Sequence, residues 1–252
     1  MKKTLRWVKI FILLYCIIGI AGYYLQDRLL FHPEPMDRKA VYHFEQPFKE
    51  LDLSYDRETN LNIVQFKATD RVGDSLAKGV VLYFHGNAGN IGLCAKEAAP
   101  FTAKGYECWM MDYPGFGKST GQFTEENLYK YALVFYKLAR SRWNISQIII
   151  CGKGFGTGVA AQLAAVRDCR RLILESPYYS LTARVRHYAP IYPVGQMLHY
   201  HFPTNEFLPE VSAPVTIFDK DGDGARLKPL LKPGDSFISG SIGSGVADAL
   251  TE

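Results

Sequence analysis

A glycine-rich turn in the middle of the chain limits its possible folds more than any other stretch. Residues 152–158 read Gly-Lys-Gly-Phe-Gly-Thr-Gly, directly after the apolar run at residues 145–151 and before the alanine-rich run at residues 159–166. The first run is typical of a buried strand, and the second is typical of a helix. A strand that turns tightly into a helix is a building unit of α/β proteins. We therefore expect an α/β fold arranged around this turn.

The same turn has the layout of a nucleophile elbow. An elbow carries Gly-x-Ser-x-Gly and holds a serine hydroxyl at the N-terminus of a helix, on a strained backbone. Here the middle position is Gly154. Glycine accepts a conformation that costs other residues about 1 to 3 kcal/mol. The setting for a nucleophile is predicted, but its hydroxyl is absent.

Strand and helix patterns alternate along the rest of the chain. Residues 48–55 and 61–66 alternate well enough to be two antiparallel strands, and residues 79–84 are apolar on both faces, as in a central strand. Further elements are expected as helices at 91–104 and 124–140 and as strands at 107–111, 145–151, 171–175 and 214–218. This order predicts an N-terminal antiparallel hairpin joined to a mostly parallel sheet that helices cover.

The N-terminal stretch has the composition of a membrane anchor. Residues 10–25 carry no charge, and Trp7 and Tyr23 lie where interfacial aromatic residues would flank a spanning helix. We expect residues 7–25 to contact the lipid bilayer as one uncleaved span, with the short basic leader in the cytoplasm and the domain on the outer, periplasmic or extracellular, side. A cleaved signal peptide is the alternative, but large residues at 23–26 occupy the place where cleavage requires small ones.

The composition favours one α/β domain over other protein classes. The chain has 252 residues, and its net charge of +4 comes largely from the N-terminal leader, so no nucleic-acid partner is expected. Five cysteines form no Cys-x-x-Cys pair and no visible disulfide framework. His199 and His201 have no neighbouring carboxylate or cysteine to complete a metal site. We expect neither a metal nor a cofactor.

Four motifs follow successive predicted strands. They are His85-Gly86-Asn87-Ala88-Gly89-Asn90, Asp112-Tyr113-Pro114-Gly115-Phe116-Gly117-Lys118-Ser119, the glycine turn itself, and Leu174-Glu175-Ser176-Pro177-Tyr178. In this order they resemble the α/β-hydrolase superfamily, particularly its membrane-anchored serine aminopeptidase-like and monoacylglycerol lipase-like branch. The resemblance covers roughly residues 30–237. We divide the chain into residues 1–26 as leader and anchor, 27–47 as connector and 48–252 as an α/β-hydrolase domain. The resemblance implies a small aromatic cap at about 176–209.

The resemblance also implies positions for a site. The family's oxyanion hole consists of two backbone N–H groups, which map onto Asn87 and Phe155, and such donors stabilise a tetrahedral intermediate. The pocket rim maps onto four further residues, which are His85, Gly86, Tyr113 and Tyr178. For the turn at His85 and Gly86, a purely structural corner is the competing interpretation.

The remaining catalytic positions are mostly unfilled. Hydrolases of this family order their triad as Ser, Asp, His, and the acid maps onto Asp221 or Asp223, for which a plain surface turn is the alternative. The base would follow the last strand near residues 239–245, which read SGSIGSG, and His201 is the last histidine in the sequence. Gly154 replaces the nucleophile. We therefore expect a catalytically impaired relative.

Three functions stay open at this point. The first is a membrane-anchored relative without hydrolysis that binds an acyl or peptide-like ligand, or a partner, in the old pocket. The second is an active hydrolase whose water is activated by Asp221 or Asp223, with the amides of Asn87 and Phe155 as oxyanion donors. The third is a non-functional product of a decayed gene or of an altered, shortened reading frame, which would fold poorly.

Overall fold

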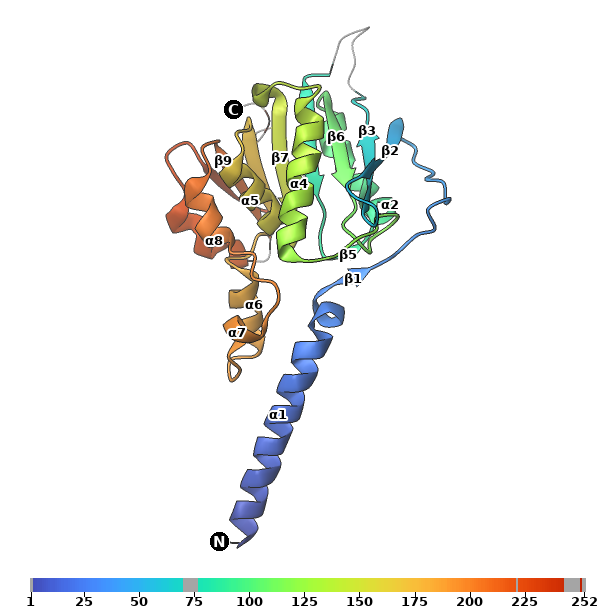
Figure 1. Ribbon diagram of the computed structural model, residues 1–252. Helices are drawn as coiled ribbons and strands as arrows, with labels where there is room; N and C mark the ends of the chain where they lie inside the picture. The colour runs from blue at the N-terminus through green and yellow to red at the C-terminus, as the bar shows by residue number, and fades with distance from the viewer. Residues whose placement is uncertain (1, 70–76, 221, 243–249, 251–252) are drawn as a thin grey trace.

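One mixed sheet forms the body of the protein. The computed structural model describes residues 2–69, 77–220, 222–242 and 250. Within them, the sheet has the strand order β10-β9-β8-β7-β4-β6-β3-β2 (Figure 1). Its strands are β2 (Phe48–Ser54), β3 (Asn60–Phe66), β4 (Gly79–Phe84), β6 (Tyr106–Met111), β7 (Ile148–Lys153), β8 (Arg171–Glu175), β9 (Val215–Asp219) and β10 (Ser236–Ser239). Strand β3 runs antiparallel to β2 and β6, and the other pairs are parallel. The predicted hairpin and mostly parallel sheet are confirmed.

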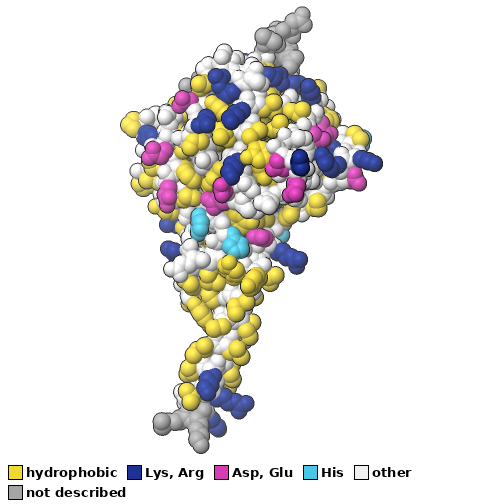
Figure 2. Space-filling view, viewed as in Figure 1, with side chains coloured by type: hydrophobic (Ala, Val, Ile, Leu, Met, Phe, Trp, Pro, Cys, Tyr) yellow, Lys and Arg dark blue, Asp and Glu magenta, His cyan; other side chains and the backbone are white. Residues whose placement is uncertain are grey.

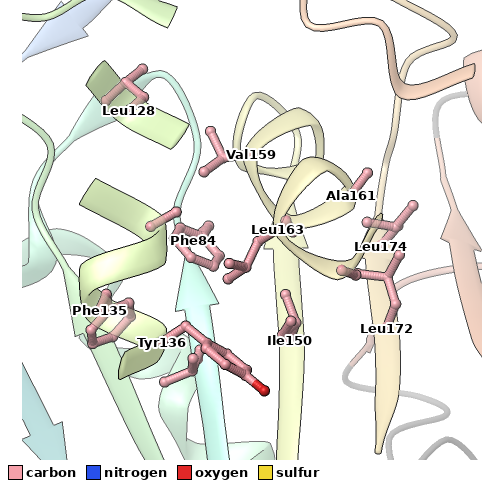
Figure 3. Packing of buried hydrophobic residues seen from close by; sticks show 14 of the residues in the cluster. Phe84, Leu128, Phe135, Tyr136, Ile150, Val159, Ala161, Leu163, Leu172 and Leu174 are labelled. Atoms are coloured by element: carbon pink, nitrogen blue, oxygen red, sulfur yellow. The ribbon is translucent and has the colours of Figure 1, made fainter. Parts of the chain in front are cut away.

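Helices cover both faces of the sheet. Helices α4 (Glu125–Arg140) and α5 (Gly156–Val166) lie on one face, where Phe84, Phe135 and Leu163 belong to one buried cluster (Figure 3). The opposite face is covered by α2 (Ile91–Cys94), the 3-10 segment η1 (Ala95–Ala98) and α3 (Ala99–Thr102). Alternate residues of each central strand enter opposite clusters, as the two-residue repeat of a strand requires.

Two predicted elements differ from the structure. The single helix expected at residues 91–104 is wrong, because this stretch forms three short segments and Pro100 stands in the first turn of α3. Proline has no N–H for a continuous helical ladder. The strand expected at 145–151 begins later, at Ile148, because residues 145–147 form a 3-10 turn capped by the side chain of Asn144.

A long apolar helix and the cap extend from the body on the same side. Helix α1 (Lys2–Leu30) is the one helix in the described part of the chain that is long and apolar enough to cross a membrane. The cap contains α6 (Leu181–Tyr188), α7 (Val194–Met197) and α8 (Thr204–Phe207), and α6 and α7 lie on the side of the body from which α1 extends (Figure 1). The rings of Tyr15 and Tyr192 stack with centroids 4.6 Å apart. The cap therefore contacts α1 directly.

The chain after α1 packs against the body. Phe31 is buried, and its ring meets the ring of Phe155 at 4.9 Å. The short strand β1 (His32–Pro33) pairs with β5 (Ala88–Gly89) in a separate two-stranded sheet. This segment connects the end of α1 to the loop that follows β4.

Candidate functional site

The carboxyl ends of the central parallel strands lie at one edge of the sheet, which is the edge nearest α1 and the cap (Figure 1). Ligands of open α/β sheets bind at this edge, because the loops that leave the strands converge there. The turns after β4, β7 and β8 meet at Gly154, whose N–H donates to the carbonyl oxygen of Glu175 at 2.8 Å. The elbow turn is thus tied to the neighbouring strand.

The two outer glycines of the elbow are required by close backbone contacts. A Cβ atom at Gly156 would lie 2.1 Å from the carbonyl oxygen of Phe84, and one at Gly152 would lie 2.5 Å from the carbonyl oxygen of Gly156. Both distances are far below contact distance. Strand β7, helix α5 and the end of β4 can approach this closely only because these positions have no side chain.

The central glycine has a different environment. Gly154 has φ of +52°, the left-handed conformation that an elbow imposes on its nucleophile. A Cβ built at this position would have no heavy atom within 4 Å. Its carbonyl oxygen accepts the N–H of Thr157 at 3.1 Å. A side chain at position 154 would therefore project into open space, on a turn whose geometry is held by its neighbours.

A pocket of about 440 Å³ lies beside Gly154 and brings together several predicted positions. Its lining includes Asn87, Phe155 and Tyr178. The side-chain amide of Asn87 donates to the carbonyl oxygen of Leu30 at 2.6 Å, which ties this loop to the end of α1. Within the described part of the chain, the backbone N–H groups of Asn87 and Phe155 have no hydrogen-bond partner. Both candidate oxyanion donors are thus placed at the pocket that contains Gly154.

Three of the four predicted rim residues, His85, Tyr113 and Tyr178, have buried side chains, and Gly86 is half-buried. Tyr113 is fully buried and donates its hydroxyl to the carbonyl oxygen of His85 at 2.9 Å, so it lies beneath the loop instead of at the rim. His85 is also buried, with Nε2 3.4 Å from Oδ1 of Asp112. Tyr178 donates to the carbonyl oxygen of Phe155 at 3.1 Å. Burial raises the pKa of Tyr113 and of Tyr178, so both phenols stay neutral and act as donors to the backbone.

The candidate acid Asp223 does not line the pocket beside Gly154. Asp223 lies 3.6 Å from the guanidinium of Arg184 and lines another pocket, together with His187 and Tyr188. Asp221 lies outside the described residues. None of residues 202–252 is a histidine.

A charged group near the elbow was missed by the sequence analysis. Lys153 Nζ lies 2.9 Å from Glu97 and 3.3 Å from Glu175, and the three residues line a second pocket that also includes Gly154. Burial lowers the pKa of Lys153, but the hydrogen bond and charge of Glu97 and Glu175 outweigh this and raise it, so the ammonium is retained. The signal was present in the sequence, since Lys153 is the charged residue of the glycine turn and Glu175 belongs to one of the four motifs.

Ser176 is a second residue without an assigned role. It follows β8 with φ of +49°, a strained conformation for a residue other than glycine, and it lines the pocket beside Gly154. The sequence cannot reveal this conformation, because nothing in a serine predicts a positive φ.

The two cap histidines have partners other than metal ligands. His201 Nδ1 lies 3.0 Å from the hydroxyl of Thr182, and the ring of His199 meets the edge of Tyr23 at 4.9 Å. Among the described residues, no three metal-ligating side chains cluster.

Comparisons with known proteins agree with this fold. The family model described as serine aminopeptidase, S33, matches residues 75–221. An uncharacterized protein of Mycobacterium tuberculosis is 29% identical over 145 residues, which is 57% of this chain and 52% of that protein. Lysophosphatidylserine lipase ABHD12 of Danio rerio is 30% identical over 169 residues, which is 57% of this chain and 43% of the lipase. The chain therefore spans about half the length of these curated relatives.

Solved structures show the same fold. An alpha-beta hydrolase from Vibrio vulnificus superposes with a TM-score of 0.64 at 19% identity, covering 80% of this chain and 79% of that one. The esterase Pf2001 of Pyrococcus furiosus superposes with a TM-score of 0.60 at 13% identity, covering 87% and 92%.

Proposed function

Since the chain belongs to the serine aminopeptidase (S33) family of α/β-hydrolases, we propose that it is a membrane-anchored member without serine hydrolase activity that binds an acyl or peptide-like ligand beside Gly154. The observation that carries this proposal is the glycine at the elbow centre, with φ of +52° and open space where a serine side chain would stand. The scaffold is retained and the nucleophile is missing.

The chemical argument follows from how a triad works. In subtilisin, losing the nucleophile or the base alone removes about as much catalysis as losing the whole triad, leaving roughly 10³ to 10⁴ over water. This chain has no hydroxyl at position 154 and no histidine among residues 202–252. Ordinary ester turnover is therefore not expected.

The main-chain donors support a binding role. The N–H groups of Asn87 and Phe155 do not depend on a serine, and Phe155 stands at the N-terminus of α5, where the helix dipole favours negative charge. We assign these two groups to an oxygen of the ligand, such as that of a carbonyl or carboxylate. The lysophosphatidylserine lipase among the relatives supports an acyl lipid over a peptide.

Anchoring and orientation complete the proposal. Helix α1 supplies the span, and Lys2, Lys3, Arg6 and Lys9 favour a cytoplasmic N-terminus. The body and the cap would then lie on the opposite side of the membrane. The division at residues 26 and 47 into anchor, connector and domain stays a prediction.

The test is ester hydrolysis by the full chain in lipid nanodiscs. We expect no turnover of short and medium acyl nitrophenyl esters and no labelling by a fluorophosphonate from a protein that unfolds cooperatively. The same protein should gain thermal stability with a non-hydrolysable acyl ligand, by about 2.7 kcal/mol at one hundred times Kd. Turnover that disappears in Asp223→Asn would overturn the proposal and establish the active alternative.

A further inference from the structure

The cap touches α1 far from the point where α1 leaves the body. The hydroxyl of Tyr192 donates to the carbonyl oxygen of Tyr15 at 3.1 Å, and the hydroxyl of Tyr15 donates to that of Ile191 at 3.1 Å. Tyr15 is fifteen residues before Leu30, so these contacts lie about 22 Å along the helix from its end.

A contact this far along α1 is inconsistent with a cap that lies entirely in water. A bilayer's hydrocarbon is about 30 Å thick and needs about 20 helical residues. If the membrane ended below the cap contact, only residues 2–14 would remain, which rise about 20 Å and include four basic side chains. If α1 spans the membrane, the cap contact must lie inside the hydrocarbon.

The cap tip, defined as residues 188–198, has the composition for that position. It reads YAPIYPVGQML, without a charge, between Arg184, Arg186 and His187 on one side and His199 and His201 on the other. Tyr188 is 76% exposed and Ile191 is 70% exposed. In Figure 2, apolar side chains gather on the narrow part of the molecule below the body, and charged ones lie at its far end and above it.

Part of the backbone of the cap tip is paired within the protein, as a medium without water requires. Lipid-exposed polar backbone groups are costly unless they are paired within the protein. The N–H groups at positions 189, 192, 194, 196 and 198 all donate to carbonyl oxygens within the cap, and Pro190 and Pro193 have none. Gln26 of α1 is buried and bridges the carbonyl oxygen of Met197 at 3.1 Å and the N–H of His199 at 2.8 Å.

A groove between α1 and the cap adjoins the pocket beside Gly154. It encloses about 220 Å³ and is apolar, with Gly19 and Gly22 on the side of α1 and Ala189 and Met197 on the side of the cap. Leu29, Leu30 and Val185 line both this groove and the pocket beside Gly154. The two spaces are therefore neighbours that share a wall.

We propose that the cap tip is embedded in the same bilayer as α1, and that the groove between them takes the acyl chain of a bilayer lipid whose polar end reaches the pocket beside Gly154. This inference rests on the anchoring by α1 proposed above. An acyl chain is the occupant because the groove would open sideways into hydrocarbon, and its lining offers an acyl chain apolar contacts along its length.

Depth-dependent quenching tests the embedding. The full chain, in a Cys16→Ser background, carries an environment-sensitive fluorophore at Ile191→Cys in phosphatidylcholine vesicles with nitroxides at mid-chain or at the headgroup. We expect mid-chain nitroxides to quench residue 191 at least about twofold more than headgroup nitroxides, because the residue would lie in hydrocarbon. Val166→Cys, at the end of α5 remote from the elbow, is the exposed control and should not be quenched.

A label at a third site distinguishes failure of the proposed embedding of the cap tip from failure of the proposed anchoring by α1. Ile12→Cys reports on α1 alone. Mid-chain quenching at 12 and at 191 supports the inference. Quenching at 12 without mid-chain quenching at 191 overturns it and leaves the anchor intact. No quenching at 12 overturns the proposed anchoring, and this inference with it.

Cross-linking tests the occupant of the groove. A phosphatidylcholine with a mid-chain diazirine should label peptides that contain Val185 or Met197. A Cβ at Gly22 would have no heavy atom within 4 Å, so Gly22→Ala adds little, whereas Gly22→Leu fills the groove. We expect the label to fall several-fold in Gly22→Leu only. Equal labelling in the two variants would overturn the lipid assignment.

Discussion

The elbow and the candidate acid Asp223, two parts of the expected catalytic site, differ in how firmly the fold holds them. At the elbow, Gly152 and Gly156 allow backbone contacts that no side chain would permit, and the turn is bonded to β8. After β9, Asp223 pairs with Arg184 in a pocket of its own. The elbow is part of the packing of the sheet, whereas Asp223 stands in a partly exposed ion pair.

This difference explains how chemistry can be lost while the fold is kept. The outer glycines serve the approach of β7, α5 and β4, so replacing them disturbs the core. A Cβ at position 154 would meet no heavy atom within 4 Å, so removing a serine side chain there costs no packing and relieves backbone strain. The position that would carry the nucleophile is therefore one at which a side chain would contact no other part of the fold.

The largest effect is expected for Gly156→Ala. Alanine in place of glycine normally favours a helix by about 1 kcal/mol. Here the new Cβ would lie 2.1 Å from the carbonyl oxygen of Phe84, and overpacking of this kind costs about 3 kcal/mol. Gly154→Ala is the matched control, with a cost of about 1 kcal/mol from its positive φ. The free energy of unfolding in urea should rank the two variants in this order, and equal values would contradict the close-contact argument.

The next largest effect is expected in the reactivity of thiols at positions 151 and 154. Burial raises the pKa of Cys151 well above its usual range, three positions before the elbow centre. In a Cys16→Ser background, Gly154→Cys should react with a disulfide reagent at least about a hundredfold faster than Cys151, because each pKa unit lowers the thiolate fraction tenfold. The rates are measured at pH 8 on the folded protein. Protection of both thiols would mean that the pocket beside position 154 is closed.

The sequence predicted the fold well because local patterns and packing agree there. The apolar runs that became β4, β6, β7 and β8 are buried along their length, and Thr124 caps α4 by accepting the N–H of Asn127. The helix expected at 91–104 is broken because Pro100 has no N–H with which to continue a helical ladder. In the site, Gly154 was identified from its pattern, whereas the strained φ of Ser176 and the contact of Tyr15 with Tyr192 depend on tertiary packing between distant segments.

A small effect is expected for Asp223→Asn. The pair with Arg184 is partly open to solvent, and such pairs contribute less than about 1 kcal/mol. Unfolding of the variant should therefore differ little from that of Glu126→Gln, which breaks the exposed pair with Lys130. A loss of several kcal/mol would show that Asp223 is held as firmly as the elbow.

The smallest effect on ester turnover is expected for Gly154→Ser, although this substitution restores the nucleophile that a hydrolase of this family would need. The new hydroxyl would stand in open space at an elbow of the required conformation, yet no base is expected to take its proton. Ester turnover should stay at background, because a nucleophile without its base contributes about as little as no triad at all. Fluorophosphonate labelling is measured beside the esterase rate, with Ser176→Ala in the same background to exclude the serine already lining the pocket. A burst of acyl-enzyme that survives Ser176→Ala would mean that a group able to accept the proton lies within reach of position 154. In that case position 154 would lack only the nucleophile, and the loss of activity would reduce to a single side chain.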